Sequence, residues 1–443
     1  MRTSLEDISP VKKKLSVEIE STEINVRLDK AYKEVGKKVK IPGFRPGKVP
    51  RKILERHIGS QVAEDVTRDL INETLPKALE EAKTFPLGVP FLEKETLKQG
   101  QNFRYSAVME VRPQFEIENY MGLEAEKENH SVTEQDIQDQ LTQIRTAHGT
   151  LNSIDPSRPI QKNDHVVLDY QGFDEGKPLE GIQSSNFLLK VGSNGFHPKF
   201  EEALIGLKKD DETEIRVEFE DSYPHTKLAG KTVNFKVKVL DIKAMLLPEL
   251  NDEFAKNLSA DFNDLEDLKN KVKETIIVQE EKRIDSELKQ NLLKKISDSV
   301  EFEIPQTLVE SEIDQAVENV KQNLIRSGSN LEKAGLSEER LRKDFKPASE
   351  RRVKNLLVLG KIAEKEKITV NEEDLTRGFK ELAESTGQNA ETLQKYYQAR
   401  NLVDALKEKL LEEKTLNYLV ENAKISLLDR EPQRKNNPKK ENE

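Results

Sequence analysis

Apolar positions in the first quarter of the chain follow two different periods. Alternation over residues 15–19 and 103–111 predicts half-buried strands, because successive side chains of a strand point to opposite faces. Helical spacing at residues 24–35 and 62–70 predicts two amphipathic helices, and Pro50 suits the first turn of a helix that starts between them. Strands at both ends with helices between them predict an α+β domain.

Strand periodicity dominates the middle of the chain. Residues 166–170, 215–219 and 233–239 alternate between apolar and polar side chains, which is typical of antiparallel strands with one buried face. One short helix is predicted among them, because Pro198 suits a first helical turn and Gly206 suits a helix end. This part of the chain is therefore expected to form a β-rich domain.

A helix and a run of turn residues separate these two regions. Thr133 and Asp136 have the spacing of a capping box, and a narrow apolar stripe over residues 137–144 follows them. Two Pro-containing turns, at Asp155-Pro156 and Arg158-Pro159, come next. We place a domain boundary near residue 155.

Helical periods return after residue 248. Helices are predicted to begin at Asn263-Asp264 and at Ile304-Pro305, and a third spans about residues 337–365. Shorter helices follow and end with one over about residues 401–423. No heptad pattern is sustained past about three repeats, so a packed helical domain is preferred to a coiled coil.

Composition limits the classes of protein that fit these patterns. A chain of 443 residues holds about three domains of about 150 residues each. No apolar run reaches the ~18 residues of a membrane span, and no apolar signal core follows Met1, so we expect a cytoplasmic chain without a membrane partner. The chain has no cysteine and six scattered histidines, and it lacks a phosphate-binding glycine loop. We therefore expect no metal and no cofactor.

Charge is distributed unevenly. The net charge is −10, yet residues 36–56 hold eight cations against one anion. Within this basic patch lies a loop whose glycines and prolines exclude a helix interior or a central strand. Its residues are Gly43, Phe44, Arg45, Pro46, Gly47, Lys48, Val49 and Pro50. A stiff loop with an aromatic ring and cations suits docking on RNA or an acidic groove, and the alternative is an ordinary turn in a solvated charge run.

Aromatic residues concentrate in the β-rich region. Residues 164–240 contain eight of the 24 aromatic side chains. This density predicts an aromatic-lined interior or pocket, and ordinary core packing is the alternative for each ring taken singly.

Two resemblances join these features. Residues 43–50 match every fixed position of Gly-Phe-Arg-x-Gly-Lys-x-Pro, the ribosome-docking motif of the trigger factor family, and residues 304–312 and 356–360 resemble its C-terminal domain. Six blocks in the middle of the chain resemble an FKBP-type peptidyl-prolyl isomerase: residues 168–172, 178–181, 185–187, 198–204, 223–224 and 233–235. The pocket that this resemblance implies consists of Tyr170, Glu180, Phe187, Phe200, Tyr223 and Phe235.

The chain departs from the family patterns at a few positions. Pro46 stands where the family often has a lysine, and Leu179 where an aromatic residue is common. His197 and Lys199 flank Pro198 where the isomerases usually have isoleucine and glycine, so we expect polarity and bulk at the pocket floor. Reduced isomerase activity is the consequence that we expect.

The resemblance implies a multidomain α+β fold in the family's order. Its expected parts are a ribosome-binding domain (1–115), a linker (116–155), an isomerase domain (156–246) with an antiparallel sheet and a short helix, an all-α arm (247–430) and a disordered tail (431–443).

The function that the resemblance implies is that of an ATP-independent chaperone. Its partners would be the protein and RNA of the large ribosomal subunit at the exit tunnel, together with nascent and unfolded polypeptides. It would prevent premature folding and aggregation and would catalyse cis/trans isomerisation of X-Pro bonds. Two alternatives stay open. One is a stand-alone isomerase whose helical region only targets it to partners, and the other is a scaffold that dimerises through its helices. A homodimer off the ribosome is compatible with the chaperone as well.

Overall fold

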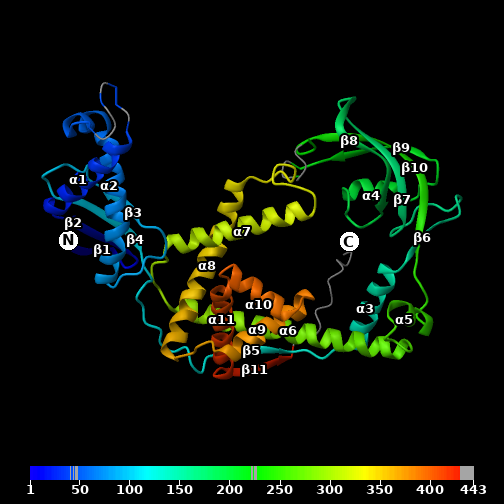
Figure 1. Ribbon diagram of the computed structural model, residues 1–443. Helices are drawn as coiled ribbons and strands as arrows, with labels where there is room; N and C mark the ends of the chain where they lie inside the picture. Colours follow the sequence, from blue (N-terminus) through cyan, green and yellow to red (C-terminus); the bar gives the residue numbers. More distant parts are fainter. Residues whose placement is uncertain (40, 43, 45–47, 221–222, 224–226, 430–443) are drawn as a thin grey trace. The chain divides into compact units, whose positions relative to one another are not determined.

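A computed structural model describes residues 1–39, 41–42, 44, 48–220, 223 and 227–429 (Figure 1). The chain divides into two compact units. One consists of residues 1–127 and 285–428, and the other contains residues 128–284. Among the described helices, none has the length and apolar character needed to cross a membrane.

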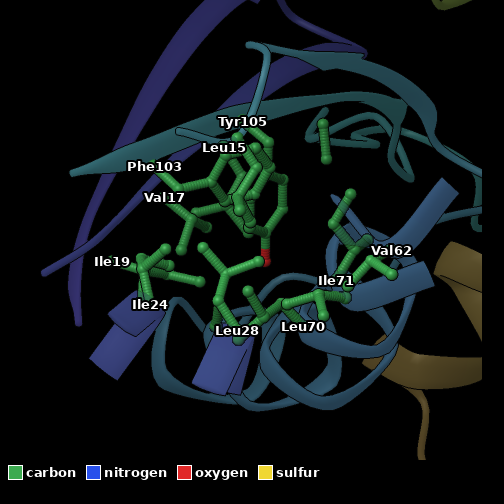
Figure 2. Packing of buried hydrophobic residues seen from close by; sticks show 14 of the residues in the cluster. Leu15, Val17, Ile19, Ile24, Leu28, Val62, Leu70, Ile71, Phe103 and Tyr105 are labelled. Carbon is green, nitrogen blue, oxygen red and sulfur yellow. The ribbon is translucent and has the colours of Figure 1, made fainter. Parts of the chain in front are cut away.

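The first unit begins with a four-stranded antiparallel sheet covered on one face by two helices. The sheet order is β1-β2-β4-β3. The elements are β1 (Arg2–Ser9), β2 (Lys12–Ile19), α1 (Ser21–Lys38), α2 (Arg51–Glu81), β3 (Phe91–Lys94) and β4 (Phe103–Glu110). Figure 2 shows how side chains of β2 and β4, such as Leu15 and Phe103, pack against Leu28 of α1 and Leu70 of α2.

Two features of this sheet region differ from the sequence-based prediction. The helix that Pro50 opens does not end before residues 62–70, because both belong to the 31-residue helix α2. The edge strands β1 and β3 were not predicted, since most of their side chains are exposed and no apolar alternation marks them.

The remainder of the first unit is mostly helical. It contains the end of α6 (Leu265–Ser299), followed by α7 (Gln306–Arg326), α8 (Glu338–Lys365), α9 (Glu372–Thr386), α10 (Ala390–Ala399) and α11 (Val403–Glu421). The predicted starts of α7 and α8 are confirmed, with Pro305 and Ser337 at the N-cap positions. Residues that follow the first sheet also belong here, because Ile117 and Tyr120 are buried against Ile362 of α8. The strand β5 (Glu124–Asn129) pairs with β11 (Lys424–Asp429).

The second unit is built on a five-stranded antiparallel sheet. The order is β6-β10-β7-β8, and β9 pairs with β10 as well. The elements are α3 (Glu134–Ala147), β6 (Thr150–Ser153), β7 (His165–Asp174), β8 (Lys177–Lys190), α4 (Pro198–Leu204), β9 (Glu212–Glu218), β10 (Thr232–Leu246) and α5 (Asp252–Leu258). Figure 1 shows the sheet curving around α4, whose Phe200 and Leu204 are fully buried against it.

The helix α3 confirms the predicted capping box. The backbone N–H of Thr133 donates to Asp136 Oδ2 over 2.8 Å, and Asp136 N–H donates to Thr133 Oγ1 over 3.3 Å. The apolar stripe of α3 packs with α5 and the start of α6 through Leu141, Phe254 and Leu268. The predicted multidomain α+β class is therefore confirmed, with a helical C-terminal region, while residues 430–443, predicted to be disordered, lie outside the described part of the chain.

Candidate functional site

Five aromatic rings converge in the concave side of the second unit's sheet. Tyr170 comes from β7, Phe187 from β8, Phe200 from α4 and Phe235 from β10, and Phe196 lies in the loop before α4. The ring centroid of Tyr170 lies 5.5 Å from Phe187, 5.5 Å from Phe196 and 6.1 Å from Phe235. Most of these pairs are edge-to-face, the arrangement that the ring quadrupole favours. We refer to these five residues as the ring cluster.

The ring cluster has a buried floor and a partly open side. Phe200 and Phe235 are 0% exposed, and their centroids lie 5.3 Å apart. Tyr170, Phe187 and Phe196 are half-buried, so each keeps part of its ring accessible. Burial raises the pKa of the Tyr170 hydroxyl, which therefore stays protonated and able to donate at neutral pH. The cluster offers an apolar surface with one hydroxyl donor.

A second set of rings adjoins this floor. The Phe219 ring lies 6.2 Å from Phe235 and 4.7 Å from Tyr223, and the imidazole of His197 lies 5.2 Å from Phe219. Tyr223 is half-buried, whereas residues 221–222 and 224–226 lie outside the described residues. Tyr223 thus joins the cluster through Phe219.

Glu180 occupies a different position from the other predicted pocket residues. It is exposed on β8, and its backbone carbonyl accepts a 2.9 Å hydrogen bond from Lys227 Nζ. Within the described parts of the chain, no hydrogen bond or ion pair joins its carboxylate to the rings. The rings, and not this carboxylate, define the candidate site.

The two polar residues that flank Pro198, His197 and Lys199, lie at the start of α4. His197 is the N-cap residue, and its Nδ1 accepts a 3.3 Å hydrogen bond from the backbone N–H of Lys199. Lys199 itself is exposed, so it does not contribute to the floor as expected from the sequence. Of these two residues, His197 is the one that brings polarity to the aromatic residues, through its half-buried imidazole beside Phe219.

Sequence reasoning missed Phe196 and Phe219 as members of the site. Phe196 is the ring nearest to Phe200, at 4.4 Å, although it lies in a loop without periodicity. Its position directly before His197-Pro198, at the start of a predicted helix, was the available signal. For Phe219, the sequence offers only the alternating pattern of a strand, which does not distinguish a pocket residue from a core residue.

A second candidate site is the loop between α1 and α2. The backbone N–H of Phe44 donates to Ile41 O over 3.1 Å. Ile41 is buried, whereas the Phe44 side chain is 40% exposed and Lys48 is exposed. The other predicted docking residues, Gly43, Arg45, Pro46 and Gly47, lie outside the described residues.

Arg51 ties the two helices together at the base of this loop. Its Nε donates to Glu55 Oε1 over 2.8 Å, its Nη1 donates to Asp29 of α1, and its guanidinium lies 5.0 Å from the centroid of the Tyr32 ring. The hydrogen bonds to Asp29 and Glu55 raise the pKa of Arg51. Arg51 is thus neutralised locally, and the described cations left exposed around the loop are Lys37, Lys38, Lys48, Lys52 and Arg56.

Comparison with known proteins shows the family to which the chain that carries these sites is related. The family model "Bacterial trigger factor protein (TF)" matches residues 1–144, its C-terminal counterpart matches residues 264–421, and "FKBP-type peptidyl-prolyl cis-trans isomerase" matches residues 157–240. A trigger factor of Geotalea uraniireducens is 36% identical over 431 residues, which cover 97% of this chain and 99% of that protein. The chain belongs to the trigger factor family. This trigger factor is a chaperone with an FKBP-type isomerase domain.

Further matches are also to trigger factors. The trigger factor of Geotalea daltonii is 35% identical over 97% of this chain and 99% of its own length. A solved structure of a trigger factor chaperone aligns over 95% of this chain and 99% of that one, at 24% identity and a TM-score of 0.49. The family assignment rests on the sequence relatives.

Proposed function

We propose that this trigger factor docks on the large ribosomal subunit at the exit tunnel through the loop between α1 and α2. There it would bind nascent polypeptides and delay their collapse or aggregation, without ATP. The observation that carries this proposal is the exposed ring of Phe44 among exposed cations, on a chain whose net charge is −10. A local basic patch favours one polyanion while the acidic remainder is repelled.

Each docking residue has a proposed role. Phe44 inserts into an apolar slot, and Arg45 and Lys48 contact ribosomal RNA phosphates or an acidic side chain. Gly43, Pro46, Gly47 and Pro50 hold the shape of the loop. The Arg51 contact with Asp29 supports this arrangement, because it joins the two helices that carry the loop, while Glu55 of the same helix α2 holds the guanidinium in place. Since Pro46 carries no charge, the docking energy falls mainly on Phe44, Arg45 and Lys48.

Co-sedimentation with ribosomes tests the docking proposal. A Phe44→Ala, Arg45→Ala, Lys48→Ala triple variant should lose most of its ribosome binding, and wild-type binding should weaken as salt concentration rises. A matched control in the same sheet region is Phe85→Ala, Arg68→Ala, Lys98→Ala, which removes the same residue types from exposed positions. Equal co-sedimentation of the loop variant and wild type would exclude the docking role.

We further propose that the ring cluster catalyses cis/trans isomerisation of X-Pro bonds. The reaction rotates an amide over a barrier of about 20 kcal/mol and needs no nucleophile. The rings of Tyr170, Phe187 and Phe196 would hold the proline and remove water from the amide, which favours the twisted, less polar transition state. Tyr223 would donate to a substrate carbonyl, and Glu180 would orient the polar rim. The half-buried imidazole of His197, which lies beside Phe219 and Tyr223, supports a reduced level of activity.

The helical region supports the binding of unfolded chains. Apolar side chains are exposed at several places on its helices or directly before them, among them Ile325 (62%), Tyr396 (49%) and Leu402 (37%). Scattered apolar contacts of this kind suit weak binding to many different sequences. We propose the domain limits 1–115, 116–155, 156–246, 247–430 and 431–443 for these activities, with residues 116–127 sharing one helical body with residues 285–428. The burial of Ile117 and Tyr120 against the C-terminal helices supports that sharing.

A further inference from the structure

Glu201 is a buried carboxylate in the first turn of α4. Glu201 is only 2% exposed, and in the sequence it lies between the fully buried Phe200 and Leu204. Burying a charged group is costly unless hydrogen bonds replace the lost water. The partners of this carboxylate therefore show what it does.

Three backbone N–H groups of one loop donate to Glu201. Gly192 N–H and Asn194 N–H donate to Oε2 over 2.7 and 3.2 Å, and Phe196 N–H donates to Oε1 over 2.9 Å. Gly192 and Asn194 have φ values of +87° and +58°, left-handed conformations that help the N–H groups of alternate residues converge on one anion. The loop between β8 and α4 is thus wrapped around a single carboxylate.

The last of these bonds fixes a ring of the candidate site. The backbone of Phe196 is itself held by Glu201. The Phe196 ring centroid lies 4.4 Å from that of Phe200 and 5.5 Å from those of both Tyr170 and Phe235. It lies 6.3 Å from Phe187, so it connects the buried floor to the accessible rings. We propose that Glu201 is a positioning residue for prolyl isomerisation, which holds the loop of residues 192–196 so that Phe196 completes the ring cluster. This inference rests on the proposed isomerase function of that cluster.

Glu201→Gln tests the inference with little change of shape. A glutamine retains one carbonyl acceptor but presents N–H groups where the second oxygen accepted, so at least one loop amide loses its partner. We expect kcat/KM for a prolyl peptide to fall about ten-fold in the full-length chain, the scale of one lost hydrogen bond to a charged group. Hydrogen exchange, followed by mass spectrometry, should become about ten-fold faster in the peptide covering residues 192–196.

The exposed neighbour Glu202 provides the matched control. Glu202→Gln makes the same chemical change on the same helix and should leave kcat/KM and loop exchange at wild-type values. Unchanged isomerase activity in Glu201→Gln would overturn the inference, even if the unfolding temperature fell, because Glu201 would then only stabilise the fold.

A double-mutant cycle with Phe196→Ala separates positioning from general destabilisation. If Glu201 acts through Phe196, the Glu201→Gln change should cost little further activity once the ring is absent. Losses that multiply independently would contradict the inference. A wild-type chain without isomerase activity would instead overturn the proposed function and with it this role, whereas an active wild type with an unaffected Glu201→Gln variant would overturn this role alone.

Discussion

At the scale of single residues, a hydrogen bond between two hydroxyls joins the first sheet to α2. Thr74 Oγ1 donates its only hydrogen to Leu70 O over 2.7 Å, so Tyr105 OH is the donor in its 2.7 Å contact with Thr74 Oγ1. Tyr105 is buried among the apolar residues drawn in Figure 2. Burial raises the pKa of its hydroxyl.

Tyr105→Phe should therefore change stability in a pH-dependent way. A phenol whose folded pKa is raised stabilises the fold fully below its unfolded pKa of about 10, and this contribution is lost as the pH rises towards the folded pKa. At pH 7 the variant should lose about 1 kcal/mol of unfolding free energy with the bond. Its alkaline loss of stability should be smaller than that of wild type.

Urea unfolding of the full chain at pH 7 and above pH ~10 measures both effects. Tyr396→Phe, which changes a 49% exposed tyrosine, is the control and should leave the neutral midpoint unchanged. An unchanged neutral midpoint in Tyr105→Phe would show that the hydroxyl contact adds nothing to stability.

At the scale of elements, two helical glycines differ in what lies beside them. A Cβ added at Gly360 of α8 would meet no atom within 4 Å, whereas one at Gly378 of α9 would lie 3.0 Å from both methyl carbons of Leu410 in α11. Leu410 is buried in a cluster with Phe379 and Leu406, so it has little room to move. Gly378 therefore permits the close approach of α9 and α11.

The two alanine substitutions should have opposite signs. Gly360→Ala should stabilise the helical region by up to about 1 kcal/mol, because alanine has the higher helix propensity. Gly378→Ala gains the same propensity but overpacks Leu410 at a cost of about 1–3 kcal/mol, so it should destabilise. Thermal unfolding followed by circular dichroism compares the two variants. A higher unfolding temperature for Gly378→Ala would mean that the Leu410 side chain can move away from the added methyl group.

Elements with local chemical signals were predictable from the sequence. Pro305 and Ser337 mark the starts of α7 and α8, and the Thr133 capping box marks that of α3, because caps act through adjacent residues. β8 was not predicted, since most of its 14 side chains are exposed and leave no alternation. Phe196 was missed for a related reason. Its position depends on a hydrogen bond to Glu201, and such a bond leaves no periodic pattern of apolar residues in the sequence.

At the scale of the whole molecule, we expect the two proposed activities to be separable. Phe187 is half-buried at the accessible side of the ring cluster, so Phe187→Ala should remove isomerase activity with little effect on the fold. If the chain works mainly as a chaperone, this variant should suppress aggregation of an unfolded client as well as wild type does. The stand-alone isomerase hypothesis requires instead that the wild-type chain itself gives no protection to a client whose folding is not limited by prolyl isomerisation.

Two assays on the same preparation decide between these hypotheses. Proline-limited refolding measures isomerisation, and light scattering of a client without prolyl-limited folding measures aggregation. Leu188→Ala, at the exposed neighbouring position on β8, is the control for changes in the strand. A Phe187→Ala variant with wild-type refolding catalysis would exclude the ring cluster as the catalytic surface.

The pairing of β5 with β11 has a consequence for how the protein folds during its own translation. Ser426 Oγ bonds Ala125 O across 301 residues of sequence, so the first unit cannot close until nearly the whole chain has been translated. At about 5–20 residues per second, residues near Ala125 wait roughly 15–60 s for their partner strand. Apart from the β5 residues Glu128 and Asn129, the contiguous residues 128–284 of the second unit can find their partners much earlier. During its synthesis, this chaperone therefore passes through the same stage of exposed, unpaired segments in which it is proposed to hold other chains.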